Sequence, residues 1–402
     1  MKNNIILITK DILIKEYLGC YGSKQYKTPN IDNLAHTGNL FQNYYTSAPS
    51  SAMAYISMFT GFYAHHTPRK HYTDFGRFSD YITLFDKLIK EGYSNHIIWD
   101  DAWMDDYDLY DGIFKKCKIH NLEISNDIGP HFKSTSKKTF NPNETKEIII
   151  NKINKIVRND DLVFVWIHLP HVLLGESGYG SDIYIFDEIV GEISNIFSRE
   201  GIFLSSDHGH MNLKKGINAY GFHLYEPVVN IPLITPRLFT QDEEKQLVSC
   251  TQLSDIILKN KIEFKDYIYA DTQYYLQSDR KFMVRKGFFK YIFNKSDRTE
   301  ELYDLKTDPD EEINLLLEKV YDRDRNRYYT MKEVHNYTNW EASEIAYFDL
   351  RNQKNKIWKE GVFFEKVKPK IKSILTHLKN YGHRSSVFYG RWGSLVRKKL
   401  GD

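Results

Sequence analysis

Residues 201–210 read Gly201-Ile-Phe-Leu-Ser-Ser-Asp-His-Gly-His210, and this stretch decides the fold of the chain. Its apolar run, Ile202 to Leu204, stops at two serines, and Asp207 and His208 then stand side by side before a glycine. Such a run is typical of a buried strand that delivers functional side chains at its carboxyl end. A carboxylate and an imidazole together suit a borderline divalent cation. The stretch therefore predicts a strand that ends in metal ligands; an Asp-His-Gly turn that caps a following helix is the alternative interpretation.

Two features nearer the amino terminus form a constellation with this pair. The apolar run from Ile5 to Ile8 predicts a second buried strand, which delivers Asp11 at its carboxyl end. Pro49, Ser50 and Ser51 precede a short apolar helix, and the free N–H groups and positive dipole end of a helix stabilise an oxyanion. A hydroxyl at this position is a candidate nucleophile, and an ordinary serine N-cap is the alternative.

Helix and strand patterns alternate along the first two thirds of the chain. This alternation predicts an α/β fold with a doubly wound, mostly parallel sheet flanked by helices. Two alternating runs around Gly287 predict a smaller antiparallel subdomain. The predicted domains are 1–262 (catalytic), 263–317 (antiparallel) and 318–402 (a helical, basic and aromatic extension). The predicted helices are 28–38, 84–90, a helix that follows 141–143, and 182–197, and the predicted strands include 41–45, 96–99, 162–167, 228–234, 281–285 and 288–293.

Composition narrows the possible partners and the compartment. Lys and Arg total 55 and Asp and Glu total 53, for a net charge of +2, which does not favour nucleic acid or a membrane surface as partner. Three cysteines without a Cys-x-x-Cys spacing predict neither a disulfide framework nor a zinc knuckle. The first eight residues become polar too quickly for a signal peptide, and no run approaches the roughly 18 apolar residues of a membrane span. We therefore expect a cytoplasmic protein without a transmembrane segment.

Taken in order, these residues resemble the sulfatase family of the alkaline-phosphatase superfamily. The resemblance extends from residue 1 to about residue 317. It implies a doubly wound α/β domain, a divalent metal, and transfer of a sulfuryl or phosphoryl group from a small-molecule or glycan-linked ester through a covalent intermediate. The matching stretches are Asn4–Asp11, Leu18–Gly22, Thr28–Leu34, Ser57–Tyr63, Ser206–Gly209, Leu224–Pro227, Phe282–Ile292 and Glu301–Pro309.

The resemblance also implies roles for six side chains. One falls where the family keeps its nucleophile, ten residues before Gly61. Three match metal ligands, and two match residues around the transferred group. The nucleophile is Ser51, whose oxygen would also be a ligand; the other metal ligands are Asp11, Asp207 and His208; the remaining two are His171, which follows a proline, and His223, which lies ahead of Tyr-Glu.

Departures from the family pattern bear on the metal. Ile12 stands where the family has a second acid, and His208 stands where it has an asparagine. Both departures lower the number of oxygen ligands, whereas Ca²⁺ takes six to eight. One Mn²⁺ or Zn²⁺ on two carboxylates, an imidazole and the seryl oxygen is therefore favoured over Ca²⁺.

Further departures bear on the nucleophile and the substrate. Ser51-Ala-Met-Ala-Tyr55 lacks the Pro and Arg of the signature that directs conversion to formylglycine, so we expect an unmodified serine. The family's Lys and His after Gly92-Tyr93 are absent, with Asp100 and Ala102 near those places.

Two classes of function remain open. The first is a metal-dependent sulfatase-family hydrolase that cleaves a sulfuric ester through Ser51. Within this class, the alternative is a hydrolase or transferase acting on a phosphodiester, a phosphonate monoester or another phosphoric ester, because a serine-bound sulfate lacks the elimination route of formylglycine. The second class is a non-catalytic relative that binds a polyanion or scaffolds an assembly.

Overall fold

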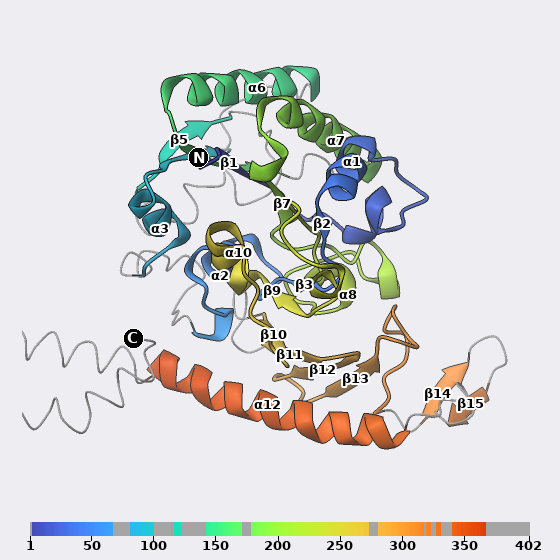
Figure 1. Ribbon diagram of the computed structural model, residues 1–402. Coiled ribbons are helices and arrows are strands. Elements are labelled where there is room, and N and C mark those ends of the chain that lie inside the picture. Colours follow the sequence, from blue (N-terminus) through green and yellow to red (C-terminus); the bar gives the residue numbers. More distant parts are fainter. Residues whose placement is uncertain are drawn as a thin grey trace, which may run out of the picture.

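A seven-stranded sheet forms the centre of the molecule (Figure 1). The computed structural model describes residues 2–66, 81–99, 114, 116–122, 142–170, 178–272, 280–316, 319–322, 327–330 and 340–366. The strand order is β2-β8-β7-β1-β6-β4-β5. The five strands from β7 to β5 are parallel, and β8 and β2 are each antiparallel to a neighbour, so the predicted mostly parallel sheet is confirmed. The bounds are β1 Ile5–Lys10, β2 Asn39–Leu40, β4 Ser94–Trp99, β5 Lys118–Asn121, β6 Val163–Leu169, β7 Ile202–Ser206 and β8 Leu233–Thr235.

The register of the central strands brings their carboxyl ends level. Lys10, the last residue of β1, pairs with Leu169 of β6 on one side and with Ser206 of β7 on the other. Asp11 and Asp207 are the residues that follow β1 and β7. The register therefore places these two carboxylates at the same edge of the sheet.

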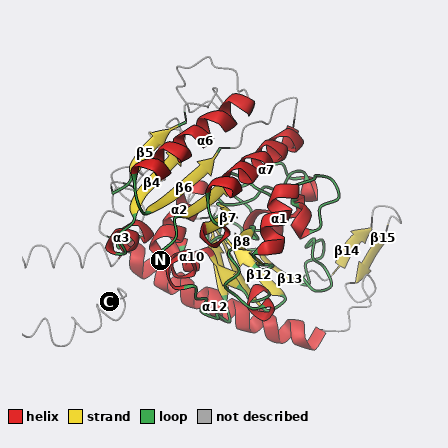
Figure 2. Ribbon diagram, turned by 45° about the horizontal axis from the view of Figure 1, so that its top comes forward, coloured by secondary structure: helices red, strands yellow, loops and turns green. Residues whose placement is uncertain are grey.

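Helices cover both faces of this sheet, because its central strands are apolar on both sides. Three helices lie side by side over one face (Figure 2) and pack on alternate residues of β1 such as Ile6 and Ile8. Three others pack on the opposite face, which Leu7 enters. Full burial of such a side chain stabilises the fold by about 1.5–3 kcal/mol. The first group is α1 Pro29–Thr37, α6 Pro142–Asn159 and α7 Gly178–Ile196, and the second is α2 Ser51–Thr60, α3 Leu84–Lys90 and α10 Leu253–Lys259.

An antiparallel sheet of four strands follows in sequence, in the order β10-β11-β12-β13. The long helix α12 runs across it, and Leu350 and Ile357 of this helix share a core with Phe282 and Val284 of β11 (Figure 1). Helix α12, which lies within the predicted 318–402 extension, therefore packs on the antiparallel sheet. The domain boundaries at 262 and 317 stay predictions, and the basic tail lies outside the described residues. The bounds are β10 Ile268–Asp271, β11 Lys281–Lys286, β12 Phe289–Asn294, β13 Glu300–Asp304 and α12 Trp340–Lys366, with a separate pair β14 Lys319–Asp322 and β15 Arg327–Thr330.

Two predicted strands are wrong in extent. The segment 228–234 begins inside a short helix, α8 Glu226–Val229, and becomes a strand only at Leu233. Pro227 lies in the first turn of α8, where its missing N–H costs nothing, and Pro232 precedes the strand. The segment 41–45 contributes only β3 Tyr44–Tyr45, which pairs with β9 Val248–Ser249 outside the main sheet. One short helix, α9 Gln241–Glu244, precedes β9.

Among the described residues, no helix combines the length and the apolar content that a bilayer crossing requires.

Candidate metal centre and nucleophile

Asp11, Asp207 and His208 meet at the carboxyl edge of the sheet. Each offers a ligand atom, and these atoms all lie within 4.8 Å of one another. His208 Nε2 lies 3.8 Å from Asp11 Oδ1 and 3.6 Å from Asp207 Oδ2. All three side chains are buried. Two strands that are almost 200 residues apart in the sequence thus build one compact cluster of oxygen and nitrogen ligands.

The two carboxylates are oriented so that one oxygen of each faces the others. Asp207 Oδ1 accepts hydrogen bonds from the backbone N–H of His208 at 2.7 Å and of Ile12 at 3.3 Å. In contrast, Asp207 Oδ2 and Asp11 Oδ1 have no hydrogen-bond partner in the described part of the chain. A buried carboxylate oxygen without a donor is costly, and a cation held between the three side chains would remove that cost. The residues present therefore fit a divalent metal ion.

His208 has the orientation of a metal ligand. Its Nδ1 lies 2.9 Å from the carbonyl oxygen of Gly209, so Nδ1 carries the proton and donates. The lone pair of Nε2 then points at the carboxylates. Tyr220 stacks on the ring at 4.6 Å between centroids and holds its plane. Gly209 is required here because a Cβ would overlap the carbonyl oxygen of Pro227.

The serine at the start of α2 faces the same point. Ser51 Oγ lies 3.3 Å from His208 Nε2. Ser50 is in the N-cap position, but its side chain makes no capping hydrogen bond, and its buried hydroxyl has no partner among the described residues. Of the two hydroxyls, it is the one on Ser51 that contacts the ligand cluster. This arrangement supports Ser51, rather than Ser50, as the candidate nucleophile.

Electrostatics also favour a cation at this point. Burial, and then the charge of Asp207, raise the pKa of Asp11 well above its ordinary value. Burial acts in the same direction on Asp207, but its polar surroundings, with His208 first among them, outweigh burial and hold the pKa of Asp207 below its ordinary value. Lys10, next to Asp11, forms a buried ion pair with Asp182 of α7 at 2.6 Å. A bound cation would allow both carboxylates to be ionised.

Ile12 supplies no ligand. Its side chain is buried against Ile14 and Ile183, so the place of the family's second acid is part of an apolar cluster. Its backbone lies in the left-handed region, with φ of 48°, which is unfavourable for a β-branched residue. This strained turn presents the Ile12 N–H to Asp207. The site therefore relies on few oxygen ligands.

Two further residues were predicted to lie near the transferred group, His171 and His223. His171 lies outside the described residues. His223 is half-buried, and its ring stacks nearly parallel to that of Tyr225, with 6.1 Å between centroids. The role of both near the transferred group stays a prediction.

Tyr55 and His168 were not predicted to contribute to the site. Tyr55 follows Ser51 by one turn of α2, and its hydroxyl lies 2.6 Å from Nδ1 of His168, near the end of β6. Burial lowers the pKa of His168 to about 3, so this imidazole is neutral. The sequence signal for Tyr55 was its i, i+4 spacing from the candidate nucleophile, which places both on one face of the helix.

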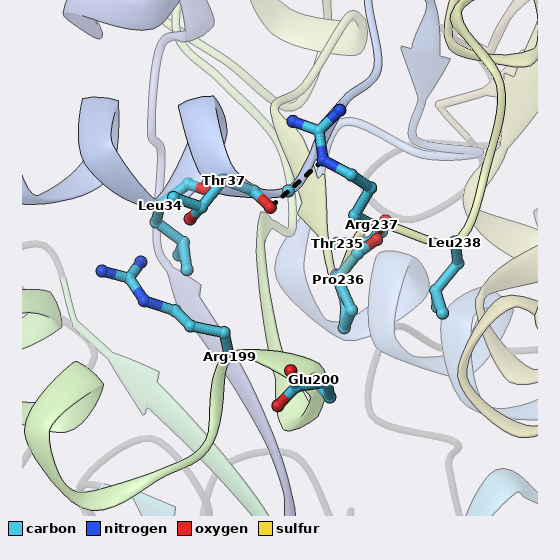
Figure 3. A pocket seen from close by; sticks show the side chains of 9 residues that line it. Leu34, Thr37, Arg199, Glu200, Thr235, Pro236, Arg237 and Leu238 are labelled. Carbon is cyan, nitrogen blue, oxygen red and sulfur yellow. Dashed lines mark hydrogen bonds between the residues drawn. The ribbon is translucent and has the colours of Figure 1, made fainter.

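A pocket of about 140 Å³ lies at the opposite edge of the sheet, where β7 begins (Figure 3). Arg237 donates from Nη2 to the carbonyl oxygen of His36 at 2.8 Å and lines this pocket with Arg199 and Glu200. The guanidinium groups of Arg199 and Arg237 do not converge on one point in Figure 3. The pocket contains none of the candidate site residues and is not the site described above.

Comparison with known proteins finds one family model and several relatives that match this chain. The model of the Sulfatase family matches residues 3–195, which include Asp11 and Ser51. The chain is 23% identical over 443 aligned positions to an arylsulfatase of Clostridium perfringens, and the alignment covers 80% of this chain and 92% of the arylsulfatase. The family match over residues 3–195 and the similarity to this arylsulfatase agree with the sulfatase resemblance of the sequence.

Solved structures share the same fold. A 2-O GAG sulfatase is similar with a TM-score of 0.60 and 16% sequence identity, over 89% of this chain and 93% of that protein. A phosphonate monoester hydrolase of Agrobacterium radiobacter is similar with a TM-score of 0.61 and 14% identity, over 90% of this chain and 96% of the hydrolase. One architecture therefore accommodates enzymes named for sulfuric and for phosphonic esters.

Proposed function

We propose that this protein is a metal-dependent hydrolase of sulfuric esters that acts through a covalent intermediate on Ser51. The observation that carries the proposal is that Ser51 Oγ contacts His208 Nε2, which clusters with the ligand atoms of Asp11 and Asp207. The similarity to an arylsulfatase over most of both chains supports sulfate as the transferred group. The substrate class is a small-molecule or glycan-linked ester.

Three side chains would hold the metal: Asp11, Asp207 and His208. When bound, a divalent ion would supply Lewis acidity, which lowers the pKa of the seryl hydroxyl and offsets the charge of the transferred group. With one nitrogen and few oxygens available, Mn²⁺ or Zn²⁺ fits better than Ca²⁺.

Hydrolysis of a sulfuric ester would take place in two steps, both of which involve Ser51. Ser51 Oγ loses its proton and forms a bond to sulfur while the bond between sulfur and the alcohol oxygen breaks, and the departing alcohol takes up a proton. The N–H groups at the start of α2 stabilise the developing negative charge. Water then attacks the sulfur of the seryl sulfate, and sulfate leaves as the serine regains its proton.

Phosphoric esters are the second candidate. Tyr55 and Met53 stand where the conversion signature requires Arg and Pro, which favours an unmodified serine. A seryl sulfate must be hydrolysed directly, because it lacks the elimination route of formylglycine, whereas seryl phosphates are ordinary intermediates. The fold shared with a phosphonate monoester hydrolase supports this candidate, and an alcohol in place of water would make the enzyme a transferase.

Turnover of four esters tests the proposal directly. Purified protein is incubated with an aryl sulfate, a phosphate monoester, a phosphodiester and a phosphonate monoester, each with Mn²⁺, Zn²⁺ and Ca²⁺. We expect hydrolysis of the aryl sulfate with Mn²⁺ or Zn²⁺. Faster turnover of a phosphorus ester would establish the second candidate. Protein that copurifies without stoichiometric metal and hydrolyses none of the four would be a non-catalytic relative.

The mass of the peptide that contains Ser51 decides between the two routes for the intermediate. We expect the mass of the encoded sequence. A loss of two hydrogen atoms at this serine would identify formylglycine and would remove the argument for phosphoric esters.

A further inference from the structure

An aromatic ring lies against the nitrogen ligand of the candidate metal site. The ring of Tyr220 stacks on that of His208, with 4.6 Å between centroids and 24° between the planes. His208 is buried and Tyr220 is half-buried. In the described cluster, Asp11 and Asp207 can offer only oxygen to a metal, and His208 offers nitrogen. The aromatic contact therefore acts on the ligand that distinguishes one kind of metal from another.

The chain doubles back after His208 and so brings Tyr220 to this position. The backbone N–H of Met211 donates to the carbonyl oxygen of Ala219 at 3.0 Å. Tyr220, the next residue, thus also lies beside His210, with 5.7 Å between ring centroids. This pairing, rather than closeness in the sequence, places the tyrosine ring against the metal ligand.

Tyr220 also packs on the apolar cluster of Ile12, Ile14 and Ile183. Ile12 stands where the family has a second acid, and His208 stands where the family has an asparagine. The isoleucine therefore does more than remove an oxygen ligand, because it provides part of the apolar surface on which the tyrosine rests. Tyr220 connects the two departures from the family pattern physically.

The stack restricts how the His208 ring can turn. The hydrogen bond from Nδ1 to the carbonyl oxygen of Gly209 fixes the tautomer, and the face of Tyr220 limits rotation of the ring plane. A ligand that binds only one orientation has an affinity reduced by the fraction of time that this orientation is absent. An aromatic pair is strong enough to change such a population about 2- to 12-fold.

We propose that Tyr220 is a positioning residue: it holds the His208 ring in the orientation that binds a metal and thereby raises the preference of the site for Zn²⁺ over Mn²⁺. Imidazole suits Zn²⁺, whereas Mn²⁺ is well served by carboxylate and water. Loss of the stack therefore weakens Zn²⁺ binding more than Mn²⁺ binding, and a merely structural contribution would weaken both alike. The inference rests on the proposed function for the presence of a metal, and its readout needs no substrate.

Calorimetric titration of the metal-free protein with Zn²⁺ and with Mn²⁺ measures this preference. Tyr220→Leu removes the aromatic face and keeps an apolar side chain, and we expect the ratio of Zn²⁺ affinity to Mn²⁺ affinity to fall about 2- to 12-fold. Tyr220→Phe keeps the ring and should retain the wild-type ratio. Tyr26→Leu is the matched control, because Tyr26 packs on the same apolar cluster and makes its edge contact with Tyr17. This control should also retain the wild-type ratio.

A variant of the ligand tests whether Tyr220 acts through the imidazole. His208→Asn offers an oxygen atom in place of the ring nitrogen, so it should lower the ratio by itself. In this background Tyr220→Leu should lower the ratio no further, because the ring that it orients is gone. The unfolding temperature of each metal-free variant shows that it is folded, and Tyr220→Met replaces Tyr220→Leu if the leucine variant does not fold.

Two outcomes would overturn the inference: a wild-type ratio in the folded Tyr220→Leu or Tyr220→Met variant, or a fall in the ratio that is equally large with and without the His208 imidazole. Either outcome, in an enzyme that still hydrolyses esters with its metal, would remove the role of Tyr220 and leave the proposed function standing. A wild-type protein that binds Zn²⁺ but hydrolyses none of the esters would contradict the proposed function, and the comparison of affinity ratios would still decide the role of Tyr220.

Discussion

Two clusters of buried charge in this molecule are built in opposite ways. At the carboxyl edge of the large sheet, Asp11 and Asp207 each turn one oxygen toward His208, and these oxygens have no donor among the described residues. The second cluster lies between α8 and the antiparallel sheet, where Glu226 and Glu311 meet cations of the chain itself.

The second cluster is neutralised internally. Lys290 Nζ of β12 lies 3.0 Å from Glu226 Oε1 and 2.9 Å from Glu311 Oε1. Arg285 of β11 lies 3.3 Å from Glu226 Oε2, which also accepts from the Tyr45 hydroxyl at 2.6 Å. These contacts join α8 and β3 to the antiparallel sheet. Burial of charge is therefore common to both clusters, and the source of the compensating cation distinguishes them.

The difference indicates how a ligand site is recognised from physical evidence. A buried ion pair that the chain completes has no need of a ligand, whereas converging carboxylates without a cation require one. Substitutions in the first cluster should affect metal and turnover, and substitutions in the second should affect stability. The following predictions test this division.

The largest expected effect is on turnover. Ser51→Ala should lower kcat by on the order of 10³-fold or more, because the attacking oxygen is lost and only the slow background reaction remains. Ser50→Ala should lower it far less, since the Ser50 hydroxyl has no hydrogen-bond partner among the described residues. Turnover of both variants is measured on the ester identified by the screen, with metal content checked. An active Ser51→Ala beside an inactive Ser50→Ala would move the role by one residue, and equal activity in both would remove the covalent mechanism.

Asp207→Ala should lose its metal without unfolding. The carboxylate supplies one of three converging ligand atoms, and its removal also relieves charge repulsion with Asp11 in the metal-free protein. Metal per chain is measured by elemental analysis, and folding by circular dichroism. Asp160→Ala, near the β5 edge of the sheet, should retain metal. Full metal occupancy in Asp207→Ala would contradict the assignment.

Lys290→Met should lower the free energy of unfolding by about 3–5 kcal/mol, because it leaves Glu226 and Glu311 buried without their shared cation. Lys286→Met is the control: its ion pair with Asp349 is exposed, and such pairs contribute about 0–1 kcal/mol. Denaturant unfolding measures both, and metal content of Lys290→Met should equal that of wild type. Loss of metal at unchanged stability would break the division between the two clusters.

The smallest expected effect is a pH dependence. Burial raises the pKa of Glu311 to about 7 from an ordinary value of 4.5. The folded state then binds the proton more tightly than the unfolded state, so this group's contribution to stability is present at low pH and is lost as the pH rises from about 4.5 to about 7. Glu311→Gln should reduce the change in the free energy of unfolding between about pH 4.5 and about pH 7. Glu91→Gln changes an exposed residue and should leave this pH dependence as it is in the wild type. If the free energy of unfolding fell no more steeply with pH in the wild type than in Glu311→Gln, the prediction would be contradicted.

Local sequence patterns predicted most of the main helices and strands of this protein. The apolar runs before Asp11 and Asp207, the glycine and proline signals at helix ends, and the antiparallel runs around Gly287 all correspond to elements of the structure. The prediction failed at 228–234, where an apolar run looks the same in a strand and in a buried helical turn. In that segment Pro227 and Pro232, rather than the apolar side chains, determine the backbone conformation.

The sequence by itself determined which residues end the strands and begin the helices, because periodicity, caps and turns are local properties. It also determined that Asp207 and His208 are adjacent. Only the tertiary structure decided that Asp11, Ser51 and this pair converge, that Ile12 packs away in an apolar cluster, and that His168 lies against Tyr55. These contacts depend on the register between strands that are far apart in the chain, and on which buried charges find a partner within it, and no short stretch of sequence encodes either.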